Sequence, residues 1–218
     1  MKPFMDEEFL LDTDAARRLY HTYAEPMPIA DYHCHIDARE IFEDRRFENL
    51  TQAWLGGDHY KWRLMRAGGV PEELVTGNGG DWEKFRKWAR VLELAAGSPL
   101  YHWSHLELRR YFGYGGVLNE RTAEEVWALT REKLKESSMG ARGLIRQSGV
   151  KVLCTTDDPA DPLEWHRRLA EDPGFPVQVL PAWRPDRAMS LERTDYPAYL
   201  ERLEAASGRK IHDFSSLL

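Results

Sequence analysis

The sequence predicts an α/β fold built around a parallel β-sheet. Three short segments that begin with apolar or β-branched residues, at 28–35, 150–156 and 177–182, alternate with stretches of helical spacing. Strands that alternate with helices pair in parallel, because each crossover returns the chain to the same end of the sheet. Polar residues follow each segment, at the edge where such sheets carry their active sites. We therefore expect an α/β protein whose functional site lies at the carboxyl ends of its strands.

The first predicted element is a short helix that leads into the first strand. Asp14 is placed to cap this helix, which is expected to run to about Tyr23. The sequence EPMP at 25–28 ends it, because proline cannot continue a helix, and the strand at 28–35 follows.

Two histidines at the end of that strand are the first candidates for chemistry. Alternate strand residues share a face, so His33 and His35 point together and Cys34 points away. Two such imidazoles can form two of the three protein ligands of an open metal site. The alternative is a pair of unrelated polar residues, because the His-x-His spacing is common. The location at a strand outlet favours the metal site.

A metal ion held by two histidines needs at least one more ligand, usually a carboxylate or a third histidine. Asp157 and Asp158, just after the second strand, are candidates by position. Their alternative role, which we favour, is to form the turn and cap before Pro159. The remaining ligand is then expected beyond Leu218.

The other elements follow from apolar spacing, capping residues and turn residues. Before the second strand we expect four helices: one over 81–95 capped by Asp81, one over 100–111, one after a capping box of Thr122 and Glu125, and one from Ser138 to Gln147. The strand at 150–156 is followed by a helix with Asp161 as cap, Pro162 at its first position and Glu164 completing a capping box. The strand at 177–182 is followed by a helix from Tyr196 to Ala206 that Gly208 ends. Residues 213–218 resemble the start of a further helix without a C-cap. We therefore expect the chain to be part of a larger protein, with a small three-stranded protein as the alternative.

Composition limits the class of protein. The 218 residues are 42% hydrophobic and carry a net charge of −6, which suits a globular protein and argues against a nucleic-acid partner held by general electrostatics. Only two cysteines are present, Cys34 and Cys154, so no disulfide framework is expected. No apolar run approaches the length of about 18–20 residues that spans a membrane. We expect a soluble cytoplasmic protein without a membrane partner.

Three further polar clusters have functional and structural readings. The sequence DHYKWR at 58–63 can donate hydrogen bonds and transfer protons to a polyhydroxylated substrate, or can be a solvated helix face. Arg184, at the outlet of the third strand, can bind a carboxylate through its guanidinium fork or form a structural salt bridge. His102 and His105 lie three apart in an aromatic helix, where packing is favoured over ligation.

The motifs taken together resemble the uronate isomerase (glucuronate isomerase) family, a divergent branch of the amidohydrolase superfamily. The resemblance runs along nearly the whole chain and is carried by six motifs: FLLDT at 9–13, DYHCH at 31–35, GDHYKWR at 57–63, PLYHW at 99–103, TTDDP at 155–159 and VLPAWRPD at 179–186. It implies the N-terminal part of a distorted (β/α)8 TIM-type barrel with a helical insertion after the first strand. The implied divisions are 1–37, with the first helix and strand, 38–148, the insertion, and 149–218, a strand–helix–strand–helix segment.

The same resemblance implies a reaction and a set of residues. The reaction is aldose–ketose isomerisation of D-glucuronate to D-fructuronate and of D-galacturonate to D-tagaturonate, through a cis-enediol. His33 and His35 match the pair that holds a divalent metal, commonly zinc. His59 and Tyr60 match residues that reach the hexuronate, Tyr60 being a candidate for proton transfer at the sugar oxygens. Arg184 matches a substrate-contacting arginine.

The chain departs from the family in length. Members are roughly twice as long, and the aspartate that completes the family's metal site has no counterpart within residues 1–218. A homo-oligomer, or association with the missing C-terminal half, is therefore expected as partner. Two alternatives stay open: a metal-dependent hydrolase of the amidohydrolase type, and a folded but inactive fragment.

Overall fold

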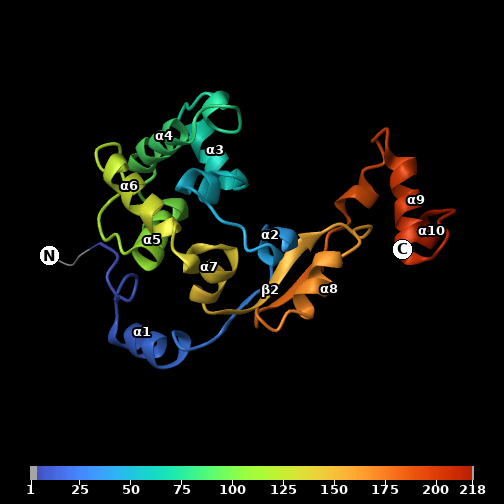
Figure 1. Cartoon of the computed structure of the whole chain (residues 1–218), viewed down its shortest axis with the longest axis horizontal. Helices are drawn as coiled ribbons and strands as arrows, with labels where there is room; N and C mark the ends of the chain where they lie inside the picture. Colours follow the sequence, from blue (N-terminus) through green and yellow to red (C-terminus); the bar gives the residue numbers. More distant parts are fainter. Residues whose placement is uncertain (1–3, 218) are drawn as a thin grey trace. The chain divides into compact units, whose positions relative to one another are not determined.

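The computed structural model describes residues 4–217, and the chain divides into two compact units (Figure 1). The helical unit consists of Met1–Met27 and Arg45–Gln147, and the sheet unit consists of Pro28–Asp44 and Ser148–Leu218. The chain therefore enters the sheet unit twice, once for the first strand and again after the long helical segment.

The sheet unit contains a parallel sheet of three strands, β1 (Ile29–Asp31), β2 (Val150–Asp157) and β3 (Gln178–Trp183), in the order β1-β2-β3. The register pairs Asp31 with Leu153 and Leu153 with Val179. The α/β class and the parallel sheet are therefore confirmed. β1 is shorter than the predicted strand at 28–35, although the Cys34 N–H still donates to the Cys154 carbonyl at 2.9 Å.

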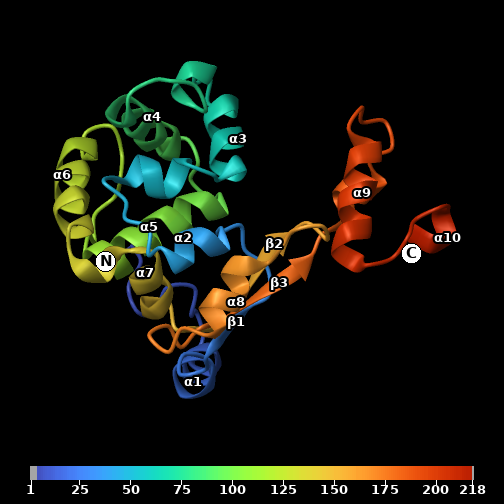
Figure 2. The same cartoon turned by 45° about the vertical axis from the view of Figure 1, so that its right-hand side comes forward.

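Helices cover the sheet and extend beyond it in this unit (Figure 2). They are α2 (Ala38–Phe42), α8 (Glu164–Ala170), α9 (Tyr196–Ser207) and α10 (Phe214–Leu217), with a 3₁₀ helix at Pro185–Met189. α8 packs on α2 and β3, and the rings of Phe42 and Trp165 lie 5.4 Å apart. Leu153, Val179 and Leu169 are buried between the strands and α8.

The end of α9 follows its sequence signal, but the start of α8 does not. Gly208 ends α9 in the left-handed region, at φ +67°, as predicted. The capping box expected at the start of α8 is wrong, because the helix begins at Glu164 after Leu163 at φ +52°. The Asp161 carboxylate instead accepts from the Asp158 N–H at 3.0 Å. In the last predicted helix, Asp213 accepts from the Ser216 N–H, and Leu218 lies outside the described residues.

The helical unit is built from short α-helices around an aromatic core. These are α1 (Asp14–Leu19), α3 (His59–Ala67), α4 (Asp81–Glu93), α5 (Pro99–Phe112), α6 (Ala123–Leu134) and α7 (Ala141–Gln147), with π-helical turns at Tyr20–Ala24 and Thr51–Leu55 and 3₁₀ helices at Glu72–Leu74 and Ser137–Met139. Phe85, Ala89 and Leu92 of α4 are fully buried, as the spacing predicted, and so is Trp88. No helix among residues 4–217 is both long and apolar enough to span a membrane.

Three of the caps predicted in this unit are wrong, and the fourth residue, Thr122, occupies the N-cap position of α6 without the predicted side-chain bond. Thr13 rather than Asp14 caps α1, since its hydroxyl accepts from the Ala16 N–H. Asp81 is already the first residue of α4, and its carboxylate accepts from the Asn49 side chain at 2.8 Å. Thr122 makes no side-chain cap to α6, and Ser138 belongs to the 3₁₀ helix before α7.

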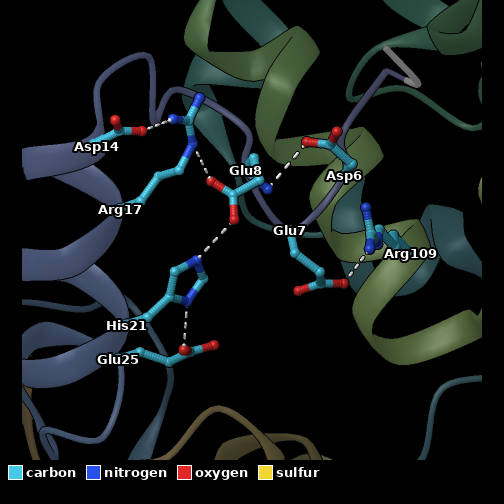
Figure 3. Close-up of polar contacts among 8 residues, drawn as sticks. All are labelled: Asp6, Glu7, Glu8, Asp14, Arg17, His21, Glu25 and Arg109. Carbon is cyan, nitrogen blue, oxygen red and sulfur yellow. Dashed lines mark hydrogen bonds and ion pairs between the residues drawn. The ribbon is translucent and has the colours of Figure 1, made fainter.

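A network of charged side chains ties the N-terminal segment to α1 and α5 within this unit (Figure 3). The Glu8 carboxylate pairs with Arg17 at 2.7 Å and with His21 at 3.2 Å, and His21 pairs in turn with Glu25 at 2.8 Å. Glu7 pairs with Arg109 of α5. These pairs hold residues 7 and 8 against α1 and α5.

Candidate metal centre and substrate site

The histidine pair lies just past the end of β1. The Nε2 atoms of His33 and His35 are 3.0 Å apart, and the two rings are nearly perpendicular, at 84°. Both side chains are exposed. Their common direction agrees with strand alternation, although the regular strand has already ended at Asp31.

The backbone between the two histidines is held against β2. The Cys34 N–H donates to the Cys154 carbonyl, and the Cys34 carbonyl accepts from the Thr156 hydroxyl at 2.7 Å. Cys34 is half-buried, and burial raises the pKa of its thiol. The thiol therefore stays protonated on the sheet side, while the imidazoles project the other way.

The donor atoms of His33 and His35 fit two ligands of one zinc ion. Two nitrogens bonded to zinc at about 2.0–2.1 Å in tetrahedral geometry lie about 3.3 Å apart. The observed separation of 3.0 Å between the two Nε2 atoms is slightly shorter, so a small outward movement of the two rings would reach the zinc geometry. Within residues 4–217, no group of three or more His, Cys, Asp or Glu side chains is arranged to hold a metal. The described part of the chain therefore places two imidazoles where they could share one metal ion, without a third such side chain beside them.

Asp157, the last residue of β2, and Asp158, directly after it, both make contacts inside the sheet unit. The Asp157 carboxylate accepts from the Thr155 hydroxyl at 2.6 Å and from the Ala182 N–H at 3.3 Å. The Asp158 carboxylate accepts from the Ala160 N–H at 2.8 Å and from the Tyr199 hydroxyl at 3.1 Å. These contacts favour the turn and packing role over metal ligation for both residues.

A cleft of about 440 Å³ opens beside His35, at the carboxyl ends of β1 and β2. Its lining mixes charged and aromatic side chains, among them His35, Arg39, Thr156, Asp157, Glu164 and Trp165. Behind it, the buried Thr155 hydroxyl lies 2.7 Å from Nε2 of His166 and donates to Asp157. Sequence reasoning missed this Thr155–His166 contact, although His166 sits on a helix already expected to follow the strand.

Arg184 leaves the sheet at the same edge. Its N–H donates to the Asp157 carbonyl at 3.1 Å, which fixes the residue beside the end of β2. Its side chain is exposed, and Nε donates to the Asp186 carboxylate at 2.5 Å. The guanidinium thus already binds a carboxylate, the group that was expected to be its ligand.

His59 and Tyr60 lie in the first turn of α3, in the helical unit. Both are exposed, and their rings stack with centroids 4.4 Å apart and planes 32° from parallel. The Asp58 carboxylate caps the helix by accepting from the Tyr60 N–H at 2.9 Å and the Lys61 N–H at 3.2 Å. The two rings therefore stand at a well-fixed helix start.

The histidines of α5 serve packing, as expected. His105 is 2% exposed and accepts at Nε2 from the Leu118 N–H at 2.9 Å. Nδ1 then carries the proton and donates to the Tyr101 carbonyl at 2.6 Å. Burial lowers the pKa of His105, so the ring is held neutral in the core.

Comparison with known proteins gives a consistent result along the whole chain. The family model for glucuronate isomerase matches residues 1–218. Over all of this chain, the uronate isomerase of Lachnospira eligens is 62% identical and that of Bacillus subtilis (strain 168) is 50% identical. The crystal structure of uronate isomerase from Thermotoga maritima superposes with a TM-score of 0.90 at 38% identity, over 99% of this chain.

This chain matches only part of each relative. This chain covers 47% of the Lachnospira eligens protein and 47% of the Thermotoga maritima chain. It therefore spans about half the length of the relatives that it matches. The glucuronate isomerase structure from Caulobacter crescentus, at 24% identity and a TM-score of 0.85, supports the fold.

Proposed function

Because this chain belongs to the glucuronate isomerase family, we propose that it carries part of the active site of a hexuronate isomerase. The reaction is the interconversion of D-glucuronate with D-fructuronate and of D-galacturonate with D-tagaturonate. The relatives are named uronate isomerases, so the hydrolase alternative is not favoured. The cytoplasm, where sugar acids are metabolised, is the proposed location.

The observation that carries this proposal is the convergence of the two Nε2 atoms of His33 and His35 beside the cleft. We propose that they hold a divalent metal, commonly zinc, together with ligands from elsewhere in the protein. Zinc bound there supplies a Lewis acid that polarises oxygens of the sugar. The exposed position of both rings suits a site that keeps open positions for substrate.

The proposed chemistry moves one proton between neighbouring carbons. A proton leaves C2 of the open-chain aldose, a cis-enediol forms, and a proton returns at C1 to give the ketose. Tyr60 is proposed to donate and accept protons at the sugar oxygens, and His59 to bind hydroxyl groups of the sugar. Because the His59 ring stacks on the Tyr60 ring, the two side chains are oriented together.

Arg184 is proposed to bind the carboxylate that distinguishes a uronate from a neutral sugar. A guanidinium fork suits a planar carboxylate. In this structure Nε donates to Asp186, so substrate binding exchanges the Asp186 carboxylate for that of the sugar acid. Such an exchange keeps the guanidinium paired and avoids the cost of an unpaired charge.

The sheet is proposed to form the first strands of a distorted (β/α)8 barrel. Within the described residues β1 and β3 each pair only with β2, so each leaves one edge without a partner strand. Open edges invite pairing with further strands. The proposed partners are therefore further strands of the same protein or a second copy of it.

The test is to incubate the intact protein with D-glucuronate in D₂O and follow the sugar by proton NMR. The proposal predicts ketose signals and incorporation of deuterium at the carbon that receives the proton. D-galacturonate is tested in parallel, and a neutral hexose serves as the control for carboxylate recognition. The absence of ketose from either uronate would contradict the proposal.

A further inference from the structure

A buried lysine lies in the same helical turn as His59 and Tyr60. Lys61 is 8% exposed, and its ammonium donates to the Asp58 carboxylate at 2.7 Å. Its neighbours on the same turn, His59 and Tyr60, point to solvent. The first turn of α3 therefore carries its candidate substrate residues on exposed positions and a partly buried ion pair beside them.

The Asp58 carboxylate makes three contacts with this turn. One oxygen accepts from the Tyr60 and Lys61 N–H groups, and the other accepts from the Lys61 ammonium. Burial acts to raise the pKa of Asp58, but the ammonium and the two N–H groups together lower it. Asp58 therefore stays ionised, and Lys61 fixes the rotamer of the residue that caps the helix.

Glu107 of α5 is a half-buried carboxyl group that interacts electrostatically with Lys61. Burial raises the pKa of Glu107, while the Lys61 charge and a hydrogen bond from the Trp54 side chain act in the opposite direction. Trp54 belongs to the π-helical turn before α3 and is itself buried. The Lys61 ammonium thus lies within electrostatic reach of two carboxylates, one from the loop before α3 and one from α5.

An apolar side chain would fill the position of Lys61 at lower cost. Desolvating an ammonium costs free energy, and Met65, one turn later on the same buried face, shows that this face accepts an apolar residue. What an apolar side chain cannot provide is the charge-assisted bond back to Asp58. The charge therefore acts on the geometry of the helix start rather than on packing.

We propose that Lys61 is a positioning residue that fixes the direction of the Tyr60 ring, and with it the Tyr60 hydroxyl, toward the substrate. The inference rests on the proposed function, because Tyr60 and His59 are its candidate substrate residues. Lys61 itself touches no substrate in this proposal. Small displacements of such groups are costly, since a shift of about 1 Å can reduce turnover about 100-fold.

The test compares Lys61→Met with Lys61→Arg, Tyr60→Phe and the double variant K61M/Y60F in the intact protein. Lys133→Met is the matched control, because Lys133 makes an exposed pair with Glu136 at the same spacing of three residues. We expect K61M to lower kcat/KM about 10- to 100-fold with kcat as the main component. We expect K61R to recover most of it and K133M to leave it unchanged.

The double variant separates positioning from general damage. If Lys61 acts through the Tyr60 hydroxyl, K61M/Y60F is no slower than Y60F alone within about twofold. The proposal would be overturned if the losses of kcat/KM in K61M and Y60F multiplied in the double variant. It would also be overturned if kcat/KM of K61M lay within twofold of wild type. If K61M does not fold, a K61R variant as inactive as Y60F would likewise overturn it.

A second readout does not depend on turnover. The protein is labelled with 3-fluorotyrosine, and the ¹⁹F signal of Tyr60 is assigned by its loss in Y60F. Because the His59 ring stacks on Tyr60, a change of ring direction shifts this signal. We expect a shift in K61M and none in K133M, and an unshifted signal in K61M would overturn the proposal. If wild type lacks isomerase activity, the proposed function fails while this readout still decides the role of Lys61.

Discussion

Removing the Asp58 carboxylate is the perturbation with the most calculable effect. Asp58→Ala deletes a helix cap, which typically costs about 0.5–2 kcal/mol. It also leaves the Lys61 ammonium, 8% exposed, without its 2.7 Å partner. Breaking a fully buried pair costs about 3–5 kcal/mol. Here that figure is reduced, because the Asp58 side chain is 31% exposed and Glu107 remains near the ammonium.

We therefore expect D58A to lower the free energy of unfolding of the helical unit by about 2–4 kcal/mol. Urea denaturation followed by tryptophan fluorescence measures this, because most of the tryptophans lie in that unit. Glu136→Ala is the control, since it removes an exposed pair worth at most about 1 kcal/mol. Equal effects of D58A and E136A would refute the account of the Asp58–Lys61 pair.

The same pair sets an acid dependence. The pKa of Asp58 is lowered in the folded protein, so the stabilisation that its ionised form gives the fold is fully present above the unfolded pKa of about 3.9. This stabilisation is lost as pH falls through the lower pKa that Asp58 has in the folded protein. The difference in stability between wild type and D58A should therefore shrink in acid. A constant difference across that range would contradict ionisation of Asp58 in the fold.

Two other groups give predictions through their pKa values. The pairs with Glu25 and then Glu8 raise the pKa of His21, against a burial effect that lowers it. Their stabilisation is present below about pH 6.5 and is lost as pH rises through the raised value. Protection of the amides of residues 6–9 from exchange, after correction for the intrinsic pH dependence of the exchange rate, should fall over that rise in wild type but not in His21→Gln. Burial, and then Asp158, raise the pKa of Tyr199 to about 12, so tyrosinate absorbance should show a group titrating near pH 12 that is absent in Tyr199→Phe.

The regular elements were predictable because their signals are local. The β-branched run at 150–156 became β2, and the apolar spacing behind Asp81 became the buried face of α4. The parallel pairing of the strands followed from the alternation of strands and helices. β1 was overestimated because the pairing of residues 32–35 with β2 keeps an extended direction without a regular ladder.

Caps failed where a more distant group competes for the same side chain. Asp81 had the right spacing for a cap, but its carboxylate is taken by Asn49. The Thr122 hydroxyl donates to the Val117 carbonyl and accepts from the Asn119 N–H. Local spacing contains no information about these partners, so a capping pattern alone overstates the chance of a cap.

The geometry of the candidate site was likewise predictable only in part. The common direction of His33 and His35 follows from strand alternation, and the structure places their Nε2 atoms 3.0 Å apart. The effect of Lys61 on Glu107 joins two helices, and the Thr155–His166 contact joins a strand to a helix. Such contacts between elements set the fine geometry of a site, and they become visible only in the folded chain.

The metal content of the intact protein tests the central claim most directly. The purified protein is analysed for zinc and other divalent metals beside His33→Ala, His35→Ala and the control His212→Ala, whose histidine is exposed in the C-terminal segment. We predict about one metal ion per chain in wild type and in H212A, and a loss of most of it in H33A and H35A, because removal of either imidazole takes one of the few protein ligands of an open site. Unchanged metal content in H33A and H35A would contradict the assignment of His33 and His35 as metal ligands.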